Sequence, residues 1–258
     1  QLMIDAGINA RAIAGQWAHN YPDQPDRHSE LGSGYGLEAY PNMSRMDWAV
    51  ELFQWFNYYL KDIGDEPEPM VQIQTNDGRW HVEDTWPPED MMWNLADIGT
   101  DWSVTGDTVN GQGASVTLVS GELTELTHIS GLPTLHLEVT TQACQGGQIF
   151  ATLYDNEENL RLGHATMDVR YRDGGYDAKA TSPFSSYTML MEFNPLDVVV
   201  PAGHTLRIEL TENGEDYLPS PCASNPLGGL TVDGGVVGLP IIDRPKSHDS
   251  WFLSLIHI

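Results

Sequence analysis

The feature that most constrains the fold is a series of short β-branched segments, separated by Gly, Asn and Asp, that occupies the chain from residue 101 onwards. Such segments suit pleated strands, and the small polar residues between them supply turns. No stretch of helical periodicity alternates with them. The series therefore predicts an all-β sandwich or jelly roll over residues 101–250. The candidate strands are 115–118, 135–141, 148–154, 160–169, 188–193, 205–209 and 230–232.

Residues 1–65 follow a different pattern, in which a strand, a long loop and a helix are expected. The apolar run 10–15 predicts a short buried strand, and the Pro-rich and Gly-rich segment 20–43 predicts a loop. The segment 44–62 has helical periodicity after a plausible N-cap serine. It predicts a core helix whose apolar face carries Met46, Val50, Phe53, Phe56 and Leu60.

Residues 66–100 are expected to connect these two regions. Glu66-Pro67-Glu68-Pro69 is an acidic extended segment, because each proline disfavours helix at the residue before it. Residues 70–74 then alternate like a strand. The sequence thus predicts three parts, 1–65, 66–100 and 101–250.

The charge balance excludes some partners. The formal net charge is -25, from 37 acidic residues against 12 Lys and Arg. Binding to nucleic acid or to an anionic membrane surface depends on clustered basic residues, so neither partner is expected. No apolar run of about 18 residues is present for a spanning helix. An acidic surface suits either a salt-adapted source or simple solubility, and both explanations stay open.

No cofactor or metal is expected. The chain lacks the G-x-S-x-G, H-E-x-x-H and paired-cysteine motifs, and Cys144 and Cys222 match no metal-ligand spacing. Whether these cysteines pair, and in which compartment the protein works, stays open. The acidic segment 155–159 could suggest calcium, but it lacks the glycine and terminal Glu of the known loop, which favours a solvated turn.

His19 is the one candidate catalytic residue. It follows the predicted strand 10–15, at the end where open α/β sheets place ligand-facing residues. Its position alone leaves a structural role open, since a lone histidine is more often a satisfied structural residue.

A family resemblance strengthens the catalytic interpretation. Residues 6–19 resemble the helix end, strand and catalytic-histidine loop of the X-prolyl dipeptidyl peptidase and cocaine esterase (CocE/NonD) family. Gly15, Trp17 and His19 match the recurrent positions, although Gln16 stands where relatives usually have proline. Further similar blocks follow in the same order, among them 47–61, 80–88, 139–155, 163–170 and 201–207.

The resemblance implies a fold and an activity. Residues 1–65 would be the C-terminal part of an α/β-hydrolase domain, and 101–250 a galactose-binding-like jelly roll. His19 would be the histidine of a Ser, Asp and His triad whose other members lie upstream of the matched segment. Asp5 lies at the helix end, whereas the family's aspartate precedes that helix, so Asp5 is not the acid. Residues 253–258 read as a non-native tail.

The expected function is therefore acyl transfer to water by a longer parent protein, acting on X-Pro peptides, esters or β-lactam side chains. The missing N-terminal half would be the partner of this chain, which alone is expected to be inactive. The alternative is a non-catalytic β-sandwich that binds carbohydrate or another protein. An exposed, coplanar set of Trp80, Trp86 and Trp102 would favour that alternative, and their burial would favour the hydrolase.

Overall fold

The structure is a computed structural model in which the chain divides into two compact units. The first comprises Gln1–Met91, Asp197–Val199 and Ile242–Ile258, and the second comprises Met92–Leu196 and Val200–Ile241. Each unit is described by itself. The residues that the structure describes are 6–15, 48–76, 80–144, 146–174, 176–214 and 217–243.

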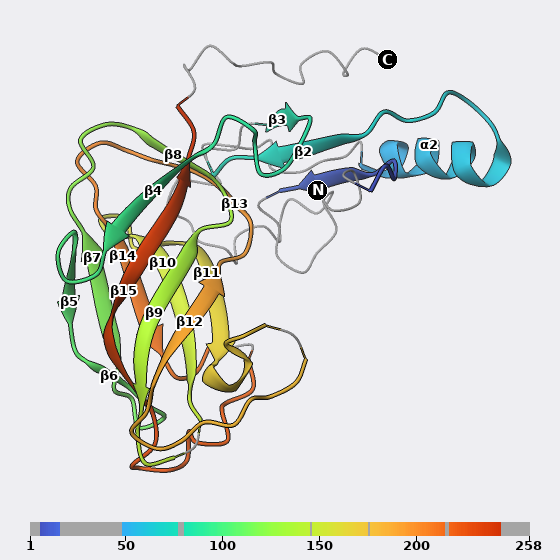
Figure 1. The fold of residues 1–258 in the computed structure, drawn as a ribbon. Helices are drawn as coiled ribbons and strands as arrows, with labels where there is room; N and C mark the ends of the chain where they lie inside the picture. The colour runs from blue at the N-terminus through green and yellow to red at the C-terminus, as the bar shows by residue number, and fades with distance from the viewer. Residues whose placement is uncertain are drawn as a thin grey trace. The chain divides into compact units, whose positions relative to one another are not determined.

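The strands from β4 to β15 form two sheets, which contain most of the second unit (Figure 1). A five-stranded sheet has the order β11-β10-β14-β7-β5, and the other sheet has the order β12-β9-β15-β8-β13 with β4 and β6 also paired to β15. The strands are β4 (Met92–Asp97), β5 (Trp102–Thr105), β6 (Thr108–Val109), β7 (Val116–Ser120), β8 (Thr127–Gly131), β9 (Thr134–Thr141), β10 (Gln148–Asp155), β11 (Leu160–Asp168), β12 (Ser186–Glu192), β13 (Leu196–Val200), β14 (Leu206–Thr211) and β15 (Leu230–Ile241).

Period-two alternation places the core of this unit. Along β9, Leu135, Leu137 and Val139 are fully buried, whereas the intervening His136 and Glu138 are exposed. The same alternation runs along β14. Burial of each such aliphatic side chain stabilises the fold by about 1.5–3 kcal/mol. The largest fully buried side chains are Phe193, Leu118, Ile129, Leu135, Leu137, Ile149, Leu153, Met189, Met191, Leu206, Ile208 and Leu210.

The first unit contains β1 (Arg11–Ala14), α2 (Trp48–Lys61), β2 (Met70–Gln74) and β3 (Trp80–Glu83). β1 pairs in parallel with β2, which pairs antiparallel with β3. Parallel neighbours need a crossover connection, and α2 lies between β1 and β2 in the chain. Among the described helices, none is both long and apolar enough to cross a membrane.

The prediction of a β-sandwich is confirmed. Each of the seven segments predicted as strands overlaps an observed strand. The 3-10 turn η3 (Val169–Tyr171) is the one helical element among the described residues of the second unit. Several strands, such as β4, β8 and β13, were not predicted, because they are short and mix apolar with charged or small residues.

The prediction that α2 is a core helix is wrong for the described part of the chain. The helix is present, but none of its residues is buried, and Phe53 and Leu60 are 62% and 73% exposed. Helical periodicity identifies an amphipathic helix without identifying the surface that covers it. The apolar face of α2, defined here as Val50, Leu52, Phe53, Phe56 and Leu60, is exposed.

Candidate functional site

The strand predicted before His19 is observed as β1, which ends at Ala14. His19 itself lies outside the described residues, as do Asp5, the loop 20–43 and the tail 253–258. The structure therefore describes the strand that precedes the candidate histidine, but not its imidazole.

β1 is joined to α2 and β2 by Arg11. Its Nη1 atom lies 2.9 Å from Glu51 Oε2, and both side chains are less than one-fifth exposed. Its Nη2 atom donates to Met70 Sδ at 3.0 Å. Because one guanidinium engages both neighbours, Arg11 fixes the strand before His19 relative to the helix that follows it.

Glu66 lies at the start of the connector and accepts several hydrogen bonds. Its carboxylate accepts from Asn9 Nδ2 at 3.3 Å, and from the hydroxyls of Tyr58 and Tyr59 at 3.4 and 3.2 Å. Partial desolvation, together with the hydrogen bonds to Glu66 and its negative charge, raises the pKa of both tyrosines. A cavity of about 380 Å³ adjoins this cluster and has no basic side chain in its lining, so it does not suit an anion. The residues that line it are Gly7, Ile8, Asn9, Glu66, Pro67, Glu68 and Pro69.

His81 also lies in the first unit, but its environment does not suit a general base. Its Nδ1 atom is 2.9 Å from Glu83 Oε1, and its Nε2 atom is 3.1 Å from Asp197 Oδ2. Burial opposes the charged imidazolium, but hydrogen bonds and the charges of Asp197 and Glu83 outweigh it and raise the pKa of His81 to about 9. An imidazole that is protonated at neutral pH cannot accept the proton of a nucleophile.

The acidic turn 155–159 lies in the second unit, and the carboxylates of Asp155 and Glu157 are bonded to the protein. Both Asp155 oxygens lie within 3.0 Å of His204 Nδ1, and Asp155 is fully buried. Glu157 accepts from the backbone N–H and the hydroxyl of Thr205 at 2.7 and 3.0 Å. Ligand atoms of Asp155, Glu157 and His204 lie within 4.8 Å of one another, a spacing that could hold a metal ion. These contacts within the protein already satisfy the carboxylates of Asp155 and Glu157, so the turn needs no ion to form.

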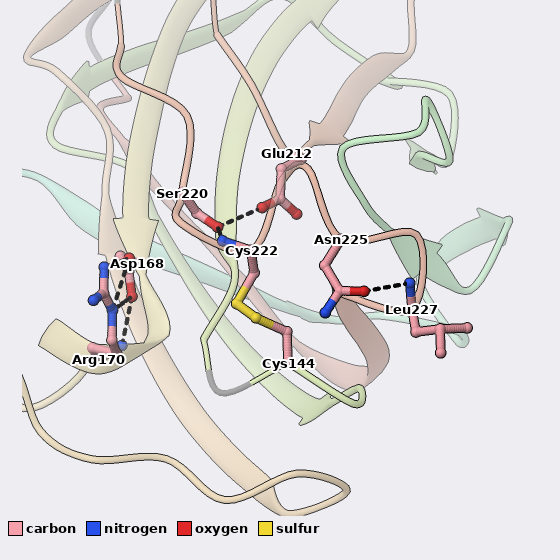
Figure 2. Close-up of a disulfide and its surroundings, with 8 residues drawn as sticks. All are labelled: Cys144, Asp168, Arg170, Glu212, Ser220, Cys222, Asn225 and Leu227. Atoms are coloured by element: carbon pink, nitrogen blue, oxygen red, sulfur yellow. Dashed lines mark hydrogen bonds and ion pairs between the residues drawn. A yellow bond between two sulfur atoms is a disulfide. The ribbon is translucent and has the colours of Figure 1, made fainter.

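A disulfide joins two loops of the second unit (Figure 2). Cys144 follows β9 and Cys222 precedes β15, and the bond closes a sequence separation of 78 residues with the Cα atoms 5.9 Å apart. Backbone hydrogen bonds from Gln142 to Gly229 and from Ala143 to Leu227 join the same loops. Cys222 is 2% exposed, whereas Cys144 is half-buried.

A buried carboxyl lies beside this disulfide. Glu212 is 2% exposed, and its Oε1 atom accepts from Ser220 Oγ at 2.7 Å. The same hydroxyl accepts from the backbone N–H of Cys222 at 3.0 Å, so Ser220 bridges Glu212 and Cys222 (Figure 2). Glu212 Oε2 is buried and has no hydrogen-bond partner among the described residues.

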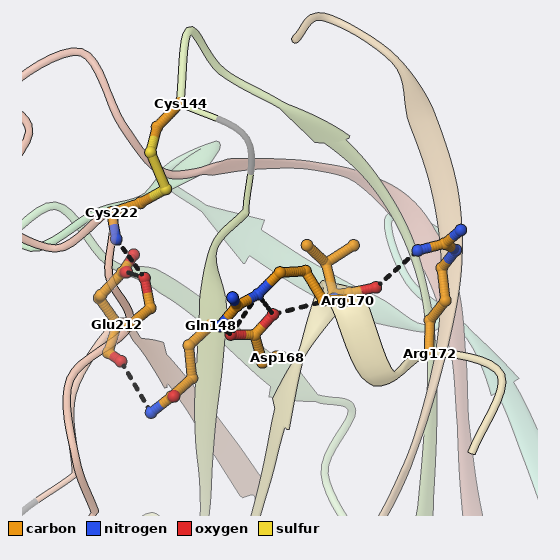
Figure 3. Close-up of polar contacts among 9 residues, drawn as sticks. Cys144, Gln148, Asp168, Arg170, Arg172, Glu212 and Cys222 are labelled. Carbon is orange, nitrogen blue, oxygen red and sulfur yellow. Dashed lines mark hydrogen bonds and ion pairs between the residues drawn. A yellow bond between two sulfur atoms is a disulfide. The ribbon is translucent and has the colours of Figure 1, made fainter. Parts of the chain in front are cut away.

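Gln148 at the start of β10 and Asp168 at the end of β11 both bear on Glu212. Asp168 Oδ2 lies 2.6 Å from Arg170 Nη2, and Gln148 Nε2 donates to the Glu212 carbonyl at 3.5 Å (Figure 3). Burial raises the pKa of Glu212, against the lowering effects of hydrogen bonds from Ser220 and from the Gln148 backbone, and the Asp168 charge adds to the increase. Arg170 is the direct ion-pair partner of Asp168.

The sequence interpretation missed the buried carboxyls of Asp155 and Glu212, although the alternation of apolar residues contains the signal. Leu206, Ile208 and Leu210 point inward along β14, and Glu212 continues the same period. Asp155 likewise continues the inward series of β10. An acidic residue at the end of a buried alternation predicts a buried carboxyl, which needs a partner or becomes harder to ionise.

Comparison with protein families identifies the greater part of the second unit. Residues 97–226 match the X-Pro dipeptidyl-peptidase C-terminal non-catalytic domain. A curated relative from Bacillus anthracis, named "Putative Xaa-Pro dipeptidyl-peptidase", is 24% identical over 270 residues. The match covers 92% of this chain but 44% of the relative, so the chain spans less than half the length of that protein.

Solved structures share the fold at low sequence identity. A CocE/NonD family hydrolase from Staphylococcus aureus aligns with a TM-score of 0.60 at 12% identity, over 91% of this chain and 54% of that one. An aminopeptidase from a marine sediment Thaumarchaeota archaeon aligns with a TM-score of 0.60 at 14% identity, over 78% of this chain and 45% of that one. At these identities the alignments establish a common fold.

Proposed function

The chain belongs to the X-Pro dipeptidyl-peptidase C-terminal domain family, and from that premise we propose that it is the C-terminal part of a serine hydrolase. In this proposal residues 1–65 complete an α/β-hydrolase domain, and 66–100 connect it to the β-sandwich over 101–250. The matched family domain is itself non-catalytic, so the chemistry would require the segment before it.

The observation that carries the proposal is the exposed apolar face of α2. A folded chain gains stability by removing such side chains from water, and large contiguous apolar patches mark surfaces that another part covers. β1 and β2 are parallel neighbours, and α2 lies between them in the chain. This is the order of an α/β unit. The curated relative is more than twice as long as this chain, which supports an upstream segment as the cover.

His19 would act as the general base of the reaction. The imidazole would take the proton of an upstream serine as that serine attacks the acyl carbon, and would return it to the leaving group. An upstream aspartate would fix its tautomer, and upstream donors would stabilise the oxyanion. Arg11 supports this role from within the described chain, because it holds the strand before His19 against α2 and β2.

The substrate class follows from the family as a proposal. Family relatives act on X-Pro peptides, esters and β-lactam side chains, and we expect the pocket that selects among them to lie mostly upstream. The alternative of a β-sandwich that binds carbohydrate loses its main support, because Trp80 and Trp102 are 9% and 2% exposed. Buried indoles cannot present a coplanar stacking surface to a sugar.

The test compares the present chain with its longer parent, using an activated ester and an X-Pro anilide. We expect the parent to hydrolyse one or both substrates and the present chain to hydrolyse neither, because it would lack the serine and the oxyanion donors. His19→Ala in the parent should reduce kcat by roughly four to six orders of magnitude.

The matched control is His136→Ala, which removes an exposed imidazole from β9. It should leave kcat of the parent unchanged. Equal losses in the two variants, or a parent that keeps its rate without His19, would show that the catalytic base lies elsewhere.

A further inference from the structure

Strand β4 of the second unit is poorly covered on both of its faces. Its one strand partner among the described residues is β15, which lies beside it in Figure 1. Five of its six residues are exposed, among them Trp93 at 48% and Leu95 at 67%. By contrast β12, which lies at an end of the same sheet, buries Met189 and Met191 completely. β4 therefore presents an uncovered edge together with an uncovered apolar surface.

The ladder with β15 determines which backbone groups of β4 point outward. Ile98 directly follows β4 and donates its N–H to the Gly235 carbonyl at 2.9 Å. In an antiparallel ladder every second residue faces the partner in this way. The N–H and C=O groups of Trp93 and Leu95 therefore point away from β15, and no strand among the described residues pairs with them. These groups can accept a further strand.

The uncovered edge is short, because hydrogen bonds close its C-terminal end. Asp97 also points outward, but its N–H donates to Asp101 Oδ2 at 2.8 Å, and its carbonyl accepts from the Asp101 N–H at 2.9 Å. Trp93 and Leu95 remain, which is enough for about four hydrogen bonds to one extended segment. Their side chains lie on one face, since a Cβ added at Gly238 would be within 3.4 Å of both. Apolar side chains of an added segment could pack against them.

The charge around β4 favours a cationic occupant. No Lys or Arg occurs between Arg79 and Arg161, a stretch that contains β4 and the strands from β5 to β10. Asp97 and Asp101 are both exposed at the end of β4. A second copy of this chain would bring its own net charge of -25 to this surface, whereas basic side chains would be attracted to it.

We infer that β4 binds a free peptide that adds as an antiparallel strand, with apolar residues opposite Trp93 and Leu95 and basic residues at its ends. In this mode of recognition the main-chain hydrogen bonds supply affinity, and the alternate side chains supply selectivity. The site does not take part in the proposed acyl transfer and does not depend on it. Because the edge is short, the complex is expected to be weak.

The primary experiment is an NMR titration of the full chain with the peptide acetyl-Lys-Val-Thr-Val-Lys-amide. The two valines can lie opposite Trp93 and Leu95, whose amide shifts should change in a saturable way. A matched peptide with both valine nitrogens methylated keeps the charge and the apolar side chains but loses two donors. It should bind about tenfold more weakly or worse. The amide shifts of Leu137 and Ile208 report whether the sandwich remains folded.

A matched pair of variants tests the same edge from the side of the protein. Leu95→Pro removes an N–H that points away from β15, which is a position where edge strands tolerate proline. It should bind the peptide about fivefold more weakly than Leu95→Ala, which keeps that N–H. If the shifts of Leu137 and Ile208 show that Leu95→Pro has unfolded, the methylated peptide decides the question on the wild-type chain.

Several outcomes would overturn the inference. Equal affinity for the methylated and unmethylated peptides, equal binding by the two folded variants, or no saturable shift at Trp93 and Leu95 would show that the backbone edge is not used. Equal affinity for a peptide with Glu in place of Lys would remove charge as the basis of selection. Shifts of Trp93 and Leu95 that change on dilution without peptide would show that a second copy occupies the edge.

Discussion

The two units of this protein differ in how completely they bury their own apolar side chains. In the second unit, strands such as β9 and β14 send alternate side chains into a shared core, where Leu137 and Ile208 are 0% and 1% exposed. In the first unit, α2 has no buried residue, and Leu60 is 73% exposed. The comparison indicates that the β-sandwich carries its own core, whereas α2 leaves an apolar face exposed, which under the proposed function an upstream segment would cover.

Removal of the disulfide should have the largest effect on the second unit. The bond closes a separation of 78 residues, and loop entropy predicts a loss of about 4.5 kcal/mol for the double variant Cys144→Ser, Cys222→Ser. Urea unfolding followed by far-UV circular dichroism measures it. Reduced wild-type protein should match the double variant, and a loss below about 1 kcal/mol would show that the loops are held by their other contacts.

A matched pair of leucines tests the comparison between the units directly. Leu137→Ala should reduce the free energy of unfolding by about 3 to 4 kcal/mol, because it removes a fully buried side chain from the sandwich core. Leu60→Ala removes the same atoms from an exposed position on α2 and should change it by less than about 0.5 kcal/mol. Equal losses in urea unfolding would contradict the distinction.

The His81 ion pairs predict a pH dependence within the first unit. The folded-state pKa of about 9 lies above the ordinary value of 6.5, so the stabilisation is fully present below pH 6.5 and is lost as the pH rises through 9. Its size is roughly 2 to 3 kcal/mol. Amide exchange of Val71 and Ile73 in β2 should report the loss. His81→Gln should abolish this pH dependence, and an unchanged profile would exclude His81 as its source.

A small effect is expected from the Arg11 and Glu51 pair, which joins β1 to α2. Glu51→Gln should cost less than about 1 kcal/mol in the exchange-derived stability of β1, because partly exposed ion pairs contribute little. The effect should decline at high salt. A loss that persists at high salt would indicate packing of the side chains as the stabilising contribution.

The sequence predicted the parts of the fold that depend on local periodicity. The β-branched runs identified β9, β10 and β11, and the helical period identified α2. The sequence did not predict which apolar surfaces are covered. Phe53 has the spacing of a core residue, but it is exposed. β13 was missed because Asp197 stands inside an otherwise apolar strand.

The candidate site was less predictable than the fold. His19 was identified from its family resemblance, and its role stays a prediction because it lies outside the described residues. Pairing of Cys144 and Cys222 could not be decided from their spacing, because it depends on loops that meet only in the folded sheets. The burial of Glu212 was recoverable in principle from the inward alternation of β14.

Hydrogen exchange of α2 tests the central claim most directly. Deuterium uptake of a peptide covering residues 48–61 would be measured in the present chain and in the proposed longer parent. We predict fast exchange in the present chain and strong protection in the parent, since upstream residues would cover the apolar face of α2. Equal uptake in the two proteins, with β9 protected in both, would contradict the account.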